Sequence, residues 1–241
     1  MIRLLDIVAS ALGLAALSPV LLLGMLVIWL HDRKPPIYRS ARVGKGGRDF
    51  MMCKLRSMTV GAERTGVYAT SNEDDRITTV GRFVRKFKLD EFPQLWNVLV
   101  GDMSLVGPRP QVRPAVEQYT EVEQGLLDAT PGITDFASIV FSDQGDIIEA
   151  CDDVELAYNQ LIRPWKSRLS LFYIEHRSLG LNLRLVMLTL SGSLARKRAL
   201  KGLQATLGRL GADEEMVAVA GRSGEIVPIP PPGANHVVTR H

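Results

Sequence analysis

The sequence predicts an α+β fold that is mostly helical, and three observations support this prediction. An uncharged apolar stretch of 24 residues, 7–30, is long enough to form a membrane-inserted helix. Residues 44–47 form a glycine-rich turn between two strand-like stretches, as expected for a small β-hairpin. Farther along, apolar residues recur with helical spacing, which predicts amphipathic helices lying at the membrane interface.

Size and composition exclude several classes of protein. The chain has 241 residues and a formal net charge of +3, which is too small to indicate nucleic acid as a partner. Hydrophobic residues make up 46% of the chain, so wholesale disorder is excluded. The two cysteines, Cys53 and Cys151, cannot hold a fold of this length together, and we expect free thiols in a reducing compartment.

The apolar stretch is expected to be retained and to enter the membrane. As a helix it would run about 40 Å, against a hydrocarbon core of about 30 Å, and it exceeds the apolar run of a signal peptide. Pro19 lies near its middle, where proline kinks or breaks a helix, and Ser18 can bond the freed carbonyl. Arg3 precedes the stretch, and Arg33 and Lys34 follow it, so both ends favour the cytoplasmic side. A re-entrant helix and a kinked transmembrane helix fit these features equally well.

A basic segment follows the apolar one. Residues 31–56 carry a local charge of +6, and most of these side chains are explained by a solvated face near anionic headgroups. Lys54 and Arg56 differ from the others, because alternation along an extended strand would point both to the same side. Two cations in that arrangement could hold a phosphate.

A polar loop and a short helix come next. Residues 59–76 are aperiodic, and we expect a loop that could close as a lid. Residues 82–88 have helical periodicity, with cations such as Arg85 opposite an apolar face. That pattern suits either the membrane surface or a protein core.

An acidic pair and a single arginine are the main candidates for chemistry. Pro93 fits the first turn of a helix, so Asp90 or Glu91 is a candidate N-cap. A carboxylate at a helix N-terminus is also kept ionised, which would make it available as a nucleophile or metal ligand. In the turn-rich loop 101–110, prolines flank Arg109, whose guanidinium matches phosphate geometry but could equally be structural.

The remainder of the chain is expected to be mainly helical. Residues 130–134 are interpreted as a turn, and residues 152–161 and 169–190 as helices. Residues 194–210 have the pattern of a basic amphipathic helix, and the proline-rich residues 228–241 are expected to be disordered. Motifs of zinc proteases, structural zinc sites, serine hydrolases and P-loop enzymes are absent from the sequence.

Taken in order, five motifs resemble the bacterial sugar transferase family, the monotopic phosphoglycosyl transferases. The motifs are Lys54-Leu55-Arg56-Ser57-Met58, Asp75-Arg76-Ile77-Thr78 with residues 80–86, residues 89–97 around Asp90-Glu91, residues 101–110 around Arg109, and residues 131–134. The resemblance covers about residues 1–192 and favours the minimal, single-domain branch of the family. It implies a re-entrant membrane helix in residues 1–34, broken at Ser18-Pro19, a catalytic domain in residues 35–192, and a basic amphipathic helix with a disordered tail in residues 193–241.

The resemblance also implies a reaction. A sugar 1-phosphate would pass from a UDP-sugar to polyprenyl (undecaprenyl) phosphate, with release of UMP, to prime exopolysaccharide or glycoconjugate assembly at the cytoplasmic face of the bacterial inner membrane. Asp90 would form an aspartyl phospho-sugar, and Glu91 would assist with the metal or with protons. Both carboxylates would bind Mg²⁺, and the substrate phosphates would be held by Lys54, Arg56, Arg85 and Arg109.

A second function fits the same features. A catalytically inactive, membrane-anchored scaffold of a glycan-assembly complex would need the anchor and the basic surface, but would tolerate loss of the acidic pair. In either case membrane lipids are expected partners, and downstream glycosyltransferases are candidates. The residues do not indicate which UDP-sugar is used, which glycan is made or what the oligomeric state is.

Overall fold

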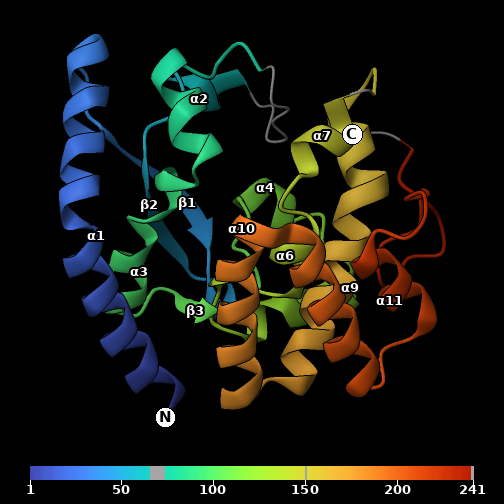
Figure 1. Ribbon diagram of the computed structural model, residues 1–241. Coiled ribbons are helices and arrows are strands. Elements are labelled where there is room, and N and C mark those ends of the chain that lie inside the picture. Colours follow the sequence, from blue (N-terminus) through green and yellow to red (C-terminus); the bar gives the residue numbers. More distant parts are fainter. Residues whose placement is uncertain (66–73, 150, 240–241) are drawn as a thin grey trace.

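The structure is a computed structural model that describes residues 1–65, 74–149 and 151–239 (Figure 1). The α-helices are α1 (Ile2–Asp32), α2 (Thr79–Lys86), α3 (Gln94–Val100), α4 (Arg113–Val116), α5 (Glu121–Gln124), α6 (Phe136–Val140), α7 (Gln144–Glu149), α8 (Val154–Ala157), α9 (Arg163–His176), α10 (Leu179–Arg209) and α11 (Glu214–Gly221). The strands are β1 (Ile37–Val43), β2 (Asp49–Leu55), β3 (Ser104–Val106) and β4 (Gly132–Thr134). Short helical turns are η1 (Lys45–Gly47), η2 (Ala62–Thr65), η3 (Leu89–Glu91), η4 (Gly125–Asp128) and the π-helical turn η5 (Tyr158–Ile162). The mostly helical α+β class is therefore confirmed.

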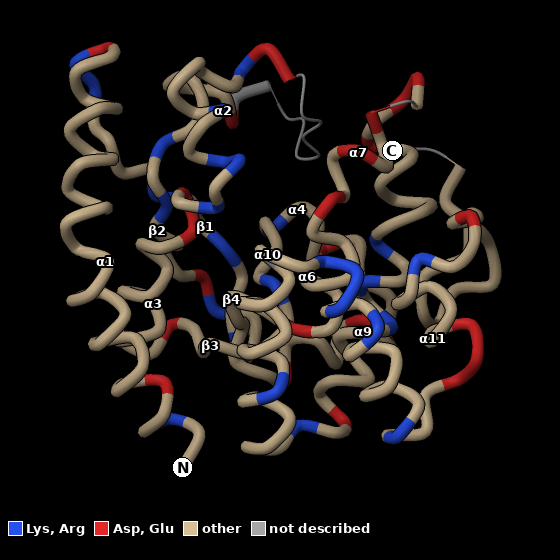
Figure 2. Tube along the Cα trace, in the orientation of Figure 1, with Lys and Arg blue, Asp and Glu red and all other residues tan. Residues whose placement is uncertain are grey.

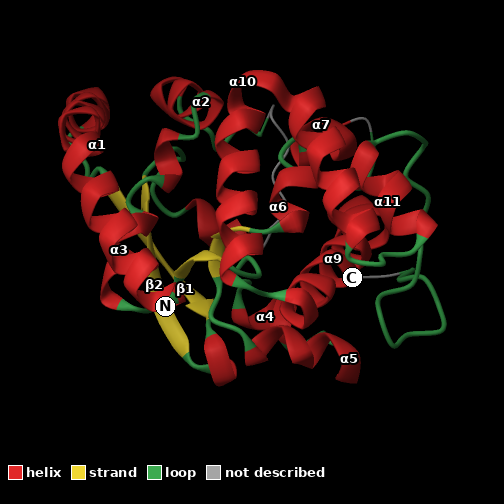
Figure 3. Cartoon of the chain, turned by 60° about the horizontal axis from the view of Figure 1, so that its bottom comes forward, coloured by secondary structure: helices red, strands yellow, loops and turns green. Residues whose placement is uncertain are grey.

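The strands form two small sheets in the middle of the molecule. β1 and β2 are antiparallel, from the pair Ile37–Leu55 to the pair Val43–Asp49, and the glycine-rich turn joins them as predicted. β3 and β4 pair in parallel, with Ser104 opposite Gly132. The predicted turn at residues 130–134 is therefore wrong in its second half, because the backbone there pairs with a strand distant in the sequence. Figure 3 shows the strands between α1 and α3 on one side and α10 on the other.

The first helix is continuous through Ser18 and Pro19, so the predicted break there is wrong. The hydroxyl of Ser18 donates to the carbonyl of Ala15 at 2.8 Å, which is the carbonyl that loses its partner because proline has no N–H. This bond restores the lost contact, and the helix bends near its middle without unwinding (Figures 1 and 3). α1 is the one helix among the described residues that is long and apolar enough to cross a membrane.

Both ends of α1 are held by the rest of the chain. Arg3 donates to two carbonyls at the C-terminal end of α3, and buried Asp6 accepts a hydrogen bond of 2.8 Å from Ser104. At the other end Asp32 forms an ion pair with Arg56. Figure 2 shows that charges on α1 are confined to these ends. The middle of the helix packs on β2 and α2 through apolar residues and leaves an apolar face exposed.

The main core is formed by residues from α6 onward together with Val106 of β3. Residues 169–190, predicted as one helix, are divided between α9 and α10, since Ser178 caps the start of α10. α10 folds back on itself at Ala195 (φ −144°, ψ 65°), and Arg184 of the first arm donates to Thr206 of the second at 2.5 Å. Apolar residues of the second arm lie in the main core with α6 and α9.

The boundary predicted at residue 193 is accordingly not a boundary of the fold. Leu203 and Leu207 are fully buried, because the helix expected to lie on the membrane instead closes the core. The tail is also in contact with the domain, as Thr120 donates to the carbonyl of Pro232 and Gln160 donates to that of Val238. Disorder was therefore the wrong expectation for the described part of the tail.

Candidate active site

A cavity of about 1530 Å³ lies between the β1–β2 hairpin and η3 on one side and α6, α9 and α10 on the other. Its walls include all six residues predicted to act in chemistry or phosphate binding: Lys54, Arg56, Arg85, Asp90, Glu91 and Arg109. Basic side chains outnumber acidic ones among the lining residues. The cavity therefore suits an anionic ligand.

Glu91 is the centre of the charge cluster. It lies in η3, and its carboxylate accepts two hydrogen bonds from Arg109, which follows β3. The ammonium of Lys54, on β2, lies 3.8 Å from the same carboxylate. Glu91 thus contacts two cations, Lys54, which precedes it in the sequence, and Arg109, which follows it.

Asp90 is placed differently from its neighbour. Its side chain lines the cavity and is only 8% exposed, yet no hydrogen bond or ion pair to its carboxylate occurs among the described residues. The predicted N-cap role is wrong, because Pro93 is the N-cap of α3 and no side chain caps that helix. The preceding Lys88 adopts a left-handed conformation (φ 56°), which turns the chain sharply into η3.

The cluster shifts the acid–base properties of its members. Burial raises the pKa of Asp90, and the charge of Glu91 raises it further, so the expectation of a dipole-stabilised anion is not met. Burial would also raise the pKa of Glu91, but Arg109 and Lys54 outweigh it and lower that pKa to about 2. Burial, followed by the charge of Arg109, lowers the pKa of Lys54 to about 8.

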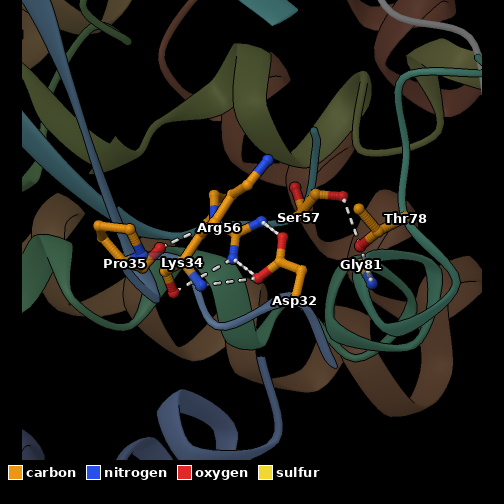
Figure 4. A network of polar contacts seen from close by, with 7 residues as sticks. All are labelled: Asp32, Lys34, Pro35, Arg56, Ser57, Thr78 and Gly81. Carbon is orange, nitrogen blue, oxygen red and sulfur yellow. Dashed lines mark hydrogen bonds and ion pairs between the residues drawn. The ribbon is translucent and has the colours of Figure 1, made fainter. Parts of the chain in front are cut away.

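Arg56 lines the cavity, but its guanidinium is bound by Asp32 and by the backbone of Lys34 and Pro35 (Figure 4). Its side chain is 6% exposed, and two of its nitrogens contact both carboxylate oxygens of Asp32 at 2.7 and 2.6 Å. A third nitrogen donates to the carbonyl of Pro35 at 2.8 Å. Arg56 therefore joins α1 to β2, and we do not assign it to phosphate binding with Lys54 and Arg109.

The other predicted residues occupy the edges of the site. Arg85 of α2 lines the cavity, and its charge opposes the rise in the pKa of Asp90. Ser18 and Pro19 shape α1 and are absent from the cavity lining. The predicted lid at residues 59–76 falls partly on residues 66–73, which lie outside the described residues.

The acidic side chains of the cavity decide whether the implied Mg²⁺ fits the site. Among the described residues, no group of three or more His, Cys, Asp and Glu side chains could hold an ion. Mg²⁺, however, commonly takes only one or two carboxylates and completes its shell with water and substrate phosphates. Asp90 and Glu91 offer two such carboxylates at one cavity, so the residues fit that group.

Lys166 is one of several charged residues of the cavity that were not predicted from the sequence to act in the site. Lys166 of α9 lines it, although helical periodicity gives no reason to separate this lysine from the other cations of the same region. Only the packing of α9 against the site reveals it.

Comparisons with known proteins agree with this geometry. A sequence model of the family described as bacterial sugar transferase matches residues 1–196. A putative undecaprenyl-phosphate N-acetylgalactosaminyl 1-phosphate transferase of Bacillus subtilis is 43% identical over 132 residues, which are 55% of this chain and 70% of that protein.

Longer alignments link the chain to larger proteins. A UDP-glucose:undecaprenyl-phosphate glucose-1-phosphate transferase of Klebsiella pneumoniae is 35% identical over 201 residues, 82% of this chain and 41% of that protein. A protein of the same description from Caulobacter vibrioides is 42% identical over 140 residues, 57% of this chain and 52% of that protein. The chain thus spans about two fifths to a half of the length of these two relatives.

Proposed function

Because the chain belongs to the bacterial sugar transferase family, we propose that it transfers a sugar 1-phosphate from a UDP-sugar to a polyprenyl phosphate such as undecaprenyl phosphate. The names of its relatives support this donor and acceptor. The observation that carries the proposal is a buried carboxylate, Asp90, that has no hydrogen-bond or ion-pair partner among the described residues and shares one cavity with Lys54 and Arg109.

The reaction then has two steps. A carboxylate oxygen of Asp90 attacks the sugar-bearing phosphorus, the bond from that phosphorus to the bridging oxygen breaks, and UMP leaves with the electron pair. An oxygen of the polyprenyl phosphate next attacks the same phosphorus and displaces Asp90, which regenerates the free carboxylate. Splitting the transfer avoids direct attack of the lipid phosphate on the diphosphate of the donor.

The remaining residues of the cluster support both steps. Lys54 and Arg109 neutralise phosphate oxygens, and Arg85 adds positive charge at the edge of the cavity. Glu91 orients Lys54 and Arg109 through its contacts with both. Mg²⁺ held by Asp90 and Glu91 would neutralise the diphosphate of the donor.

The attachment of α1 supports a re-entrant arrangement. The helix is tied to the same domain near its start, through Arg3 and Asp6, and at its end, through Asp32. A spanning helix would place these ends on opposite sides of the bilayer. With both ends on the cytoplasmic side, the exposed apolar face of α1 enters the inner membrane, and the cavity lies near the headgroups, where the lipid phosphate is found.

Substitution of the nucleophile tests the proposal. Asp90→Asn removes the attacking charge, and we expect transfer of labelled sugar phosphate to undecaprenyl phosphate to fall at least about 1000-fold, consistent with loss of a covalent nucleophile. Asp75→Asn changes an exposed aspartate that does not line the cavity, so it should retain activity. Near-normal turnover by Asp90→Asn would remove Asp90 as the nucleophile.

A second experiment separates two-step transfer from direct transfer. Wild-type protein incubated with a labelled UDP-sugar and Mg²⁺, but without lipid, should release up to one equivalent of UMP and retain the labelled sugar phosphate. Release that depends strictly on the lipid would indicate direct transfer. An inactive scaffold would release no UMP with any UDP-sugar of a panel, even when lipid is present.

A further inference from the structure

Lys166 is a half-buried cation of the cavity that lacks an acidic partner among the described residues. Its ammonium donates to the side-chain oxygen of Gln144 and lies 5.4 Å from the ring centre of Tyr158. Both partners are uncharged at neutral pH. Within the described part of the chain, no carboxylate lies within ion-pair distance of Lys166.

Lys166 lines the same cavity as Lys54, Asp90, Glu91 and Arg109. Burial, followed by the positive charge of Arg109, lowers the pKa of Lys166 to about 7. The same two causes lower the pKa of Lys54, so Arg109 lies near both lysines. A desolvated ammonium without a carboxylate is unfavourable in the free protein, and a bound anion would compensate for it.

The cavity lining differs between its two ends. Leu17, Leu95 and Leu190 line it from α1, α3 and α10, the elements that carry exposed apolar residues. Around Lys166, α7 and η5 line the cavity with Gln144, Gly145, Asp146, Tyr158 and Asn159. Aromatic rings and amides suit a nucleoside, through stacking and hydrogen bonds, whereas the leucines suit a polyprenyl chain.

We propose that Lys166 forms a second phosphate site in this cavity, which binds the nucleotide phosphate of the UDP-sugar and of the UMP product. This inference rests on the proposed function and assigns Lys54 and Arg109 to the sugar-bearing phosphate. In the first step the bridging oxygen keeps the electron pair of the broken bond and becomes part of UMP. Lys166 neutralises the charge that develops on that phosphate. The lipid phosphate is the competing source of the same chemistry.

Binding of UMP tests the site without turnover. Isothermal titration of the detergent-solubilised full chain with UMP should show an affinity that is about 10- to 100-fold weaker for Lys166→Met, the range expected for a lost charge-assisted hydrogen bond. Lys166→Arg should restore binding to within about fivefold, because it keeps the charge. Arg168→Met is the matched control, since it removes a cation of α9 that does not line the cavity, and it should bind like wild type.

Kinetics distinguish the nucleotide phosphate from the lipid phosphate. In a two-step reaction, kcat/KM for the UDP-sugar reports the first step and kcat/KM for undecaprenyl phosphate the second. Lys166→Met should lower the first value about 10- to 100-fold and change the second by less than about threefold. A fall in kcat/KM for undecaprenyl phosphate alone would assign Lys166 to the lipid phosphate. Equal falls in kcat/KM for both substrates would overturn its assignment to the nucleotide phosphate.

Unchanged UMP affinity in Lys166→Met would also overturn the inference. Folding is checked by the unfolding midpoint, which we expect to be unchanged or raised, because the variant removes a half-buried charge that has no acidic partner among the described residues. Failure of the proposed function gives a different pattern. In that case the wild-type protein would transfer no sugar phosphate, whereas a wrong assignment of Lys166 leaves wild-type transfer and the loss in Asp90→Asn intact.

Discussion

At the scale of single residues, Glu91 and Asp90 show how neighbouring carboxylates acquire different properties. Glu91 contacts Arg109 and Lys54, which keep it ionised, whereas Asp90 is buried beside it without such a contact. Catalytic sites commonly contain two neighbouring acids whose pKa values differ because their surroundings differ. The acidic pair was visible in the sequence, but the division between the two was not.

The pH dependence of the first step follows from Lys54. Its pKa of about 8 means that the cation is lost as the pH rises through that value, so we expect kcat/KM for the UDP-sugar to fall above about pH 8. In Lys54→Arg the charge persists, so the part of the fall that follows the pKa of about 8 should disappear, at a lower absolute rate, and only a fall that follows the pKa of Lys166, about 7, should remain. Lys45→Arg, in the hairpin turn, should keep the wild-type profile. An unchanged alkaline profile in Lys54→Arg would show that the loss of the Lys54 cation does not contribute to the fall.

A second residue-scale prediction concerns stability. Glu123 is fully buried and accepts hydrogen bonds from Arg163 at 2.9 Å and from Ser167 at 2.7 Å. Glu123→Ala leaves the guanidinium of Arg163 without its partner, and we expect a loss of about 3–5 kcal/mol in the free energy of unfolding. Glu121→Ala, at an exposed position of the same helix, should change it by less than about 0.5 kcal/mol. Thermal unfolding of both variants in detergent compares them.

At the scale of secondary-structure elements, the pairing of β3 with β4 positions the loop that carries Arg109. Gly107 donates to the carbonyl of Thr134 at 2.9 Å, and Gly132 donates to that of Pro108 at 2.9 Å. A side chain at Gly132 would lie 2.0 Å from the backbone nitrogen of Gly107. Two glycines thus permit an approach of the strands that no other residue allows.

Replacement of Gly132 should therefore separate the strands. We expect Gly132→Ala to lower the free energy of unfolding by at least about 3 kcal/mol, the upper end for overpacking, and to reduce transferase activity by displacing Arg109. Gly180→Ala is the control, since a methyl group there meets no atom within 4 Å in α10. That variant should be neutral or stabilised by up to about 1 kcal/mol. Equal midpoints for the two variants would contradict the proposed role of the close approach.

At the scale of the whole molecule, α1 is part of the domain that it anchors. Its apolar residues pack with β2 and α2, and its ends are tied to α3, β3 and the end of β2. The second arm of α10 likewise completes the core, although it lies mostly beyond the residues that match the family. Segments at both ends of the chain therefore stabilise the walls of one cavity.

The topology of α1 gives a whole-molecule prediction. In a background with Cys53 and Cys151 replaced by Ser, single cysteines at Ile2 and Lys34 should react with a membrane-impermeant thiol reagent from the same side of the membrane. The cytoplasmic side is expected, since both ends contact the domain that holds the site. Cysteines that react from opposite sides would show a spanning helix.

The sequence by itself determined the elements whose signals are local. An uncharged stretch, a glycine-rich turn and helical spacing predict α1, the hairpin and the amphipathic helices, because each depends on residues a few positions apart. The motifs around Asp90 and Arg109 likewise indicated the chemistry.

Only the tertiary structure decided which side chains meet. Arg56 pairs with Asp32 across 24 positions, and Arg109 pairs with Glu91 across 18. Lys166 reaches the same cavity from α9, and the second arm of α10 turns inward to the core. Burial and partnership depend on residues that are distant in the sequence, so local patterns cannot distinguish a cation that holds α1 in place from one that is available to bind a phosphate.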